Sequence, residues 1–129
     1  MRAVDTNIIV RFLTDDDPQQ SRTARSLIEA GDIFIPVTVI LESEWVLRGG
    51  YGYPSVRIAE AFRGLAGLFG VTMENSAQLG QALDWMAEGM DFADALHLAK
   101  AEGCDAFLSF DRRLAKVARG RSPLTVREA

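Results

Sequence analysis

Short β-prone runs alternate with helical segments along this chain, and this alternation constrains the fold more than any other feature. Strands are predicted at residues 2–4, 33–35, 71–73, 106–108 and 124–126. Between these runs, apolar residues recur at the three- and four-residue spacing of helices. This order is typical of an α/β domain in which helices connect the strands of a mainly parallel sheet.

Several residues are expected to mark where helices begin and end. Asp17 precedes a proline, which is the order of an N-cap followed by proline at the first helical position. The acidic triplet 15–17 is therefore interpreted as a solvated loop ending in a cap, in preference to a metal site. Thr38 is predicted to cap the next helix, and a later helix is expected to bury Phe69 and to end at Gly70.

The size and composition of the chain restrict its class. At 129 residues with 48% hydrophobic content, it is expected to form one soluble domain spanning residues 1–129. No apolar run approaches the roughly 20 residues that span a bilayer, so no membrane association is expected. Asp5 and Arg11 interrupt any signal peptide, and the single cysteine, Cys104, fits a reducing cytoplasm.

The net charge of −4 excludes a protein that binds nucleic acid mainly through a basic surface. A polyanionic substrate would have to be bound locally, through cations or a few arginines. The net charge therefore does not exclude a nuclease.

Four acidic residues lie among apolar residues, where an isolated carboxylate is costly to bury. They are Asp5, Glu42, Asp94 and Asp111. No basic residue nearby in the sequence is an obvious partner, and carboxylates that converge in this way usually share a hard divalent cation. Asp5 and Asp111 each follow a predicted strand, so both lie at the same sheet edge if those strands are parallel neighbours.

Each acidic residue also has a structural interpretation. Asp5 is equally suited to cap the first helix through the amide of Ile8, and Asp111 to cap the helix that follows it. Asp91 and Asp94 share one face of a helix, and capping is the favoured role for Asp91.

Two further residues leave alternatives open. Glu42 and Glu44 are two positions apart on a helix, so they face different ways and one of them is expected at the surface. His97, the only histidine, is favoured as a structural or surface residue over a general base.

The joint pattern of motifs resembles the PIN domain, and most closely the VapC-type toxin ribonucleases of bacterial type II toxin–antitoxin pairs. The motifs are, in order, D-T-N after the first strand, apolar-E-x-x-W-V-L, D-x-x-D-A-L-H-L-A and S-F-D-R-R-L. The resemblance extends from Ala3 to about Val126. It implies a single PIN domain with three α/β/α layers around a mainly parallel central sheet.

The resemblance assigns catalytic and metal-binding roles to Asp5, Glu42, Asp94 and Asp111. Asp91 matches an acidic position that some members have and is a further candidate ligand. Glu42 is preferred to Glu44 because it fits the E-x-x-W-V-L spacing. Small polar positions beside the site, which would orient carboxylates or water, fall on Thr6, Asn7 and Ser109.

The implied activity is that of a Mg²⁺- or Mn²⁺-dependent endoribonuclease that cleaves RNA with a metal-activated water. The implied partners are an RNA substrate, a small antitoxin protein and a second copy of the chain in a homodimer. Arginines available for phosphate contacts are Arg11, Arg48, Arg112 and Arg113.

Two other classes of function are alternatives to a nuclease. A phosphate-handling aspartate enzyme or receiver-like switch would need a lysine after a late strand, and Lys116 lies within a predicted helix instead. A non-catalytic interaction module of the same fold would be favoured by the loss of an acidic position, and all four are present. The RNA target, the antitoxin and the number of metal ions are not specified by the sequence.

Overall fold

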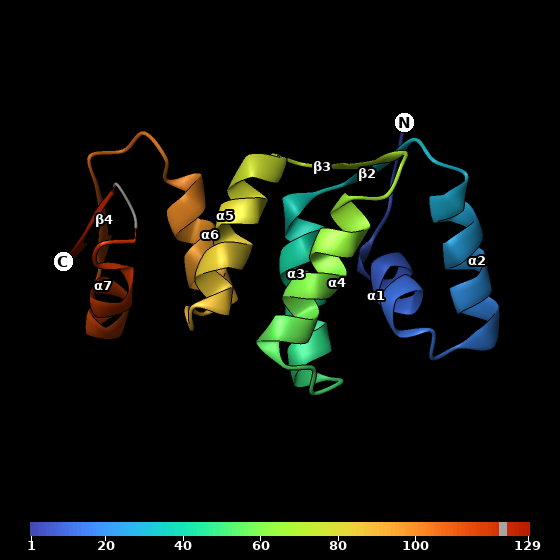
Figure 1. Ribbon diagram of the computed structural model, residues 1–129, viewed down its shortest axis with the longest axis horizontal. Helices are drawn as coiled ribbons and strands as arrows, with labels where there is room; N and C mark the ends of the chain where they lie inside the picture. Colours follow the sequence, from blue (N-terminus) through green and yellow to red (C-terminus); the bar gives the residue numbers. More distant parts are fainter. Residues whose placement is uncertain (122–123) are drawn as a thin grey trace. The chain divides into compact units, whose positions relative to one another are not determined.

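The computed structural model describes residues 1–121 and 124–129 and divides the chain into two compact units, 1–76 and 77–129 (Figure 1). Every strand pairing in both units is parallel. The α/β class expected from the alternation of strands and helices is confirmed.

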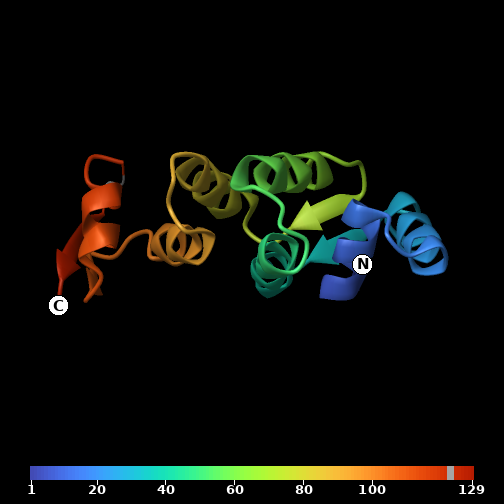
Figure 2. The same ribbon diagram turned by 90° about the horizontal axis from the view of Figure 1, so that it is seen from below.

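The first unit contains a three-stranded sheet in the order β1-β2-β3. Its strands are β1 (Arg2–Ala3), β2 (Ile33–Ile35) and β3 (Val71–Met73), and its helices are α1 (Thr6–Thr14), α2 (Pro18–Glu29), α3 (Val37–Gly49) and α4 (Ser55–Ala66). Ile33 is in register with Arg2 on one side and with Val71 on the other. Helix α1 contacts both α2 and α3 (Figure 2).

The second unit contains a two-stranded parallel sheet and the remaining helices. In chain order its elements are α5 (Ser76–Ala87, which begins on the last residue of the first unit), α6 (Phe92–Lys100), β4 (Ala106–Ser109), α7 (Arg112–Ala118) and β5 (Thr125–Glu128). The register pairs Ala106 with Thr125 and Ser109 with Glu128.

Each unit has a hydrophobic interior, because burying large apolar side chains is the main stabilising contribution to folding. In the first unit the fully buried side chains include Ile9, Ile33, Ile35 and Phe62. In the second unit Phe92, on the apolar face of α6, is also fully buried.

Some local predictions are confirmed and others are wrong. Asp17 caps α2 by accepting a hydrogen bond from the Gln20 amide at 2.9 Å, as its sequence context predicts. The prediction for Thr38 is wrong, because α3 begins at Val37 after an N-cap proline that makes no side-chain hydrogen bond.

The predicted end of α4 is also wrong. The helix ends at Ala66 with Gly67 as its C-cap, so the apolar spacing continues beyond the helix itself. Phe69 therefore lies outside the helix and is fully exposed instead of buried. Among the described residues, no helix is long and apolar enough to cross a membrane.

Candidate functional site

Asp5 lies between β1 and α1 and is the N-cap of α1. Its extended backbone positions the side chain to accept a hydrogen bond from the Ile8 amide at 3.1 Å. The capping interpretation of Asp5 is therefore confirmed. This bond uses one carboxylate oxygen of an exposed side chain, so capping does not by itself exclude a second role as a ligand.

Glu42 is connected to the start of α1 by a hydrogen bond. The Thr6 hydroxyl donates to Oε1 of Glu42, joining α1 to α3. Thr6 is buried and Glu42 is exposed, so the buried hydroxyl holds a carboxylate that solvent can reach. Because Thr6 directly follows Asp5, this bond brings Glu42 to the end of α1 that Asp5 caps.

Glu44 has a different environment. Its side chain is 4% exposed, and its Oε2 lies 2.9 Å from Nε of Arg48 one turn later. The expectation that only one of the two glutamates faces solvent is confirmed. Glu44 is a buried carboxylate with a cationic partner, whereas Glu42 presents its carboxylate beside Thr6.

In the second unit two further acidic residues cap helices. Asp91 accepts a hydrogen bond from the Asp94 amide at 3.2 Å at the start of α6, and Asp111 accepts from the Arg113 amide at 2.9 Å at the start of α7. The Asp111 amide in turn donates to the Ser109 hydroxyl at 3.0 Å. Ser109 thus fixes the turn from which the Asp111 side chain projects.

Asp94 lies in the first turn of α6 and is partly buried. Its pKa is raised above that of an ordinary aspartate, first by burial and then by the negative charges of Asp91 and Asp111. The positive charges of His97 and Arg113 act in the opposite direction. Asp94 is therefore close enough to Asp91 and to Asp111 to be repelled by their charges.

The donor set suits a hard divalent cation, because it consists of carboxylate oxygens. The repulsion of Asp94 by Asp91 and Asp111 is also the condition that a bound cation would relieve. Nevertheless, the described part of the chain contains no group of three or more His, Cys, Asp or Glu residues arranged to hold a metal ion. The acidic residues thus form two sets, one in each unit. Asp5 and Glu42 form the set of the first unit, and Asp91, Asp94 and Asp111 form the set of the second.

The arginines differ in how their charges are used. Arg11 is engaged by Asp16 at 3.0 Å, Arg48 by Glu44, and Arg112 by Glu128 at 3.2 Å. Arg113 is exposed and acts on Asp94 through its charge.

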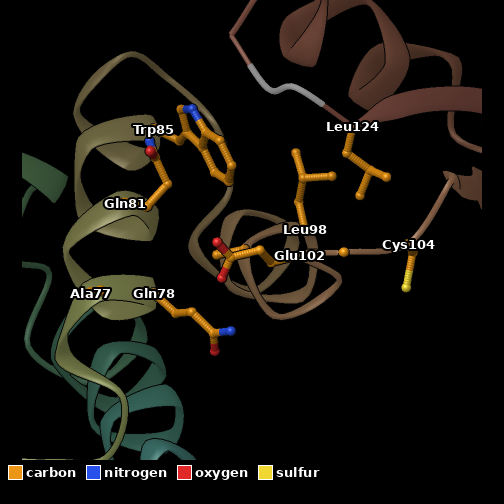
Figure 3. Close-up of a pocket in the computed structure, with 10 residues that line it drawn as sticks. Ala77, Gln78, Gln81, Trp85, Leu98, Glu102, Cys104 and Leu124 are labelled. Atoms are coloured by element: carbon orange, nitrogen blue, oxygen red, sulfur yellow. The ribbon is translucent and has the colours of Figure 1, made fainter.

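Two hollows in the structure were not predicted from the sequence. A groove of about 450 Å³ in the first unit includes Asp5 and Asn7 together with polar residues at the start of α2. A second hollow of about 510 Å³ lies in the second unit, where Trp85, Leu98 and Leu124 form apolar walls (Figure 3). None of the proposed site residues lines this second hollow.

No local signal in the sequence would have identified the groove as a whole, because its walls come from two helices, α1 and α2. The Asp17 cap predicts only where α2 begins.

A protein-family model for the PIN domain matches residues 2–120, which extends across both units. A search of curated proteins finds no match to this chain.

Proposed function

The chain belongs to the PIN domain family, and from this membership we propose that it is a Mg²⁺- or Mn²⁺-dependent endoribonuclease. PIN domains are typically metal-dependent nucleases. The observation that carries the proposal is the crowding of negative charge at Asp94, whose pKa is raised by burial and by Asp91 and Asp111. Perturbed carboxyl groups of this kind are typical of functional sites.

The proposed cation ligands are Asp5, Glu42, Asp94 and Asp111, with Asp91 as a further candidate. A divalent cation bound by such carboxylates would neutralise phosphate charge and lower the pKa of a water molecule. The choice of Mg²⁺ or Mn²⁺ rests on the all-oxygen donor set.

The remaining residues have proposed roles in positioning. Thr6 holds the Glu42 carboxylate in one orientation, and Ser109 fixes the backbone of Asp111. Asn7 lines the groove beside Asp5, where its amide is available to substrate or water. Arg113, which is exposed and acts on Asp94 through its charge, has the proposed role of binding a phosphate of the RNA.

We further propose that the chain is the toxin of a VapBC-type toxin–antitoxin pair and forms a single PIN domain over residues 1–129. The family match across both units supports one domain, and the motifs around Asp5, Glu42 and Asp94 support the toxin class. A small antitoxin presenting an arginine would pair with the acidic residues.

Two further proposals concern assembly and location. Trp45, which is 66% exposed on α3, is the proposed contact of a homodimer, since tryptophan is enriched at protein–protein interfaces. The exposed thiol of Cys104 supports a reducing cytoplasm.

A cleavage assay tests the nuclease proposal. Mixed cellular RNA is incubated with the purified chain and Mg²⁺ or Mn²⁺, with EDTA as the control. We expect internal cleavage that EDTA abolishes. Absence of cleavage with either metal would refute the nuclease proposal and favour the non-catalytic alternative.

A separate experiment tests the toxin assignment. The chain is co-expressed with the product of the neighbouring reading frame, and both are followed through purification. Co-elution together with loss of RNA cleavage is expected. A chain that elutes alone and stays active would contradict the toxin assignment without affecting the nuclease proposal.

A further inference from the structure

The groove beside Asp5 has mostly polar walls made by two helices of the first unit. Helix α1 contributes Asn7, Ile8 and Arg11, and the start of α2 contributes Asp17, Gln19, Gln20 and Thr23. A segment of single-stranded RNA bound at Asp5 would pass these side chains. The inference drawn from this groove rests on the proposed nuclease function.

Gln20 stands out because the orientation of its amide group is fixed. The Arg11 Nε donates to Oε1 of Gln20 at 2.7 Å. An arginine has only donors, so the atom facing it must be the amide oxygen. The Gln20 nitrogen and its two N–H groups therefore point away from Arg11, and among the described residues they donate to no partner.

Arg11 is itself held on its other side. Its Nη1 donates to Asp16 at 3.0 Å and to the Tyr51 hydroxyl at 3.1 Å, and Tyr51 also hydrogen-bonds to Asp16. Tyr51 lies 40 residues further along the chain, in the segment between α3 and α4. Arg11, Asp16 and Tyr51 are thus positioning residues that prepare Gln20 before any ligand arrives.

The charges in the groove indicate what these N–H donors can contact. Asp5 and Asp17 both line it, and the charge of Arg11 is already paired with Asp16. Away from the cation proposed at Asp5, Asp17 would repel phosphate oxygens, so a neutral acceptor is favoured near Gln20. In single-stranded RNA, the neutral acceptors that distinguish one nucleotide from another lie on the edges of the bases.

We propose that Gln20 is a specificity-determining residue that donates hydrogen bonds to a base carbonyl of the RNA next to the cleavage site. Uracil offers two carbonyl oxygens, whereas the acceptors of adenine are ring nitrogens, two of which lie beside its exocyclic amino group, a donor that competes with the N–H groups of Gln20. Because Arg11 occupies the Gln20 oxygen, the two-bond contact that glutamine usually makes with adenine is disfavoured. The wild-type chain therefore prefers uridine to adenosine at one position flanking the cut.

The test exchanges donor for acceptor at this residue. Short RNAs that differ only by U or A at each flanking position are cleaved by the wild type and by Gln20→Glu and Gln20→Leu. Glutamate keeps an acceptor for Arg11 but removes both N–H donors. We expect the U:A ratio of kcat/KM at one position to fall about three- to tenfold in both variants, mainly through KM. The fall is expected to be larger for Gln20→Glu, because a carboxylate accepts from the adenine amino group.

Ser26→Glu is the matched control. It adds the same charge to α2, at an exposed position outside the groove, so the U:A ratio should stay at the wild-type value. An equal change in Ser26→Glu, or a ratio unchanged in Gln20→Glu, would overturn the proposal. A uniform rise in KM for U and A alike would overturn it as well, because that result indicates a phosphate contact.

Binding to Asp94→Asn separates the failure of this proposal from failure of the nuclease proposal. Dissociation constants for U-rich and A-rich oligonucleotides are compared with and without Gln20→Glu in that background. If the wild type cleaves RNA with neither metal while the binding ratio falls on Gln20→Glu, the nuclease proposal is refuted and the base contact is supported. Cleavage with an unaltered ratio would refute the base contact alone, and a chain that neither binds nor cleaves RNA refutes both.

Discussion

The Thr6 hydroxyl donates a hydrogen bond to the Glu42 carboxylate and so connects the start of α1 with the middle of α3. Because Thr6 is buried, its hydroxyl has a fixed position from which to orient an exposed carboxylate. Residues that orient a ligand in this way typically affect metal affinity or activity nearly as much as the ligand itself.

Thr6→Val removes this hydroxyl with little change in volume. We expect RNA cleavage to fall about 10- to 100-fold, with a free energy of unfolding lower by roughly 1 kcal/mol. Thr6→Ser, which retains the hydroxyl, should recover most of the activity. Cleavage kinetics and urea unfolding check both expectations, and equal activity of the valine and serine variants would show that the hydrogen bond has no catalytic role.

Glu42 and Glu44 provide a matched pair of substitutions on one helix. Glu42→Gln should abolish most RNA cleavage and leave the melting temperature nearly unchanged, because its carboxylate is exposed. Glu44→Gln should lower the free energy of unfolding by about 1–3 kcal/mol, because it weakens the hydrogen-bonded ion pair that the buried Glu44 carboxylate makes with the half-exposed Arg48. If Glu44→Gln loses cleavage at unchanged stability while Glu42→Gln stays active, the two assignments must be exchanged.

The hydrogen bonds to Asp16 predict a pH dependence of stability. Bonds from Tyr51 and Thr14, together with the charge of Arg11, lower the pKa of Asp16 below that of an ordinary aspartate. A lowered folded-state pKa stabilises the protein above the unfolded value of about 3.9, and this contribution is lost as the pH falls through the folded pKa. Asp16→Asn should therefore reduce stability at pH 7 more than at pH 3. Thermal unfolding of both proteins across this range measures the difference, and parallel curves would contradict it.

Much of the fold was predictable because its signals are local. Proline and glycine closely flank the runs at 33–35 and 71–73, which form strands with those bounds. The interpretations of Asp5, Asp91 and Asp111 as helix caps are confirmed, because capping requires only a short polar side chain within three residues of a free amide.

The predictions that failed, and the contacts that were missed, depend on more than local pattern. Phe69 continues the apolar spacing of α4, but Gly67 ends the helix before it. The Tyr51 hydroxyl reaches Arg11 across 40 residues, and no periodicity within either segment indicates that contact. The burial of Glu44 in place of Glu42 likewise follows from the packing of α3 and not from helix spacing alone.

Asp94 gives the most direct test of the proposed metal site. Its raised pKa means that the folded state holds a proton to higher pH than the unfolded chain does, so in metal-free protein stability should decrease as the pH rises through that pKa. Asp94→Asn removes this dependence and should leave metal-free protein at pH 7 as stable as the wild type or slightly more stable. A cation that binds only the folded state stabilises it by mass action, so Mg²⁺ or Mn²⁺ should raise the melting temperature of the wild type and have a smaller effect on the variant.

RNA cleavage by Asp94→Asn should fall by more than about a hundredfold, since substituting residues that only orient metal ligands already lowers metal affinity or activity about 10- to 100-fold. Asp105→Asn, an exposed aspartate in the same unit, is the control and should alter neither cleavage nor the metal-induced shift. Calorimetry with and without metal, combined with cleavage kinetics, measures all of these quantities. An Asp94→Asn variant that cleaves RNA normally, or that unfolds without metal, would establish Asp94 as a structural residue. Loss of a metal ligand should reduce cleavage, and loss of a carboxylate that its neighbours repel should not destabilise the metal-free protein.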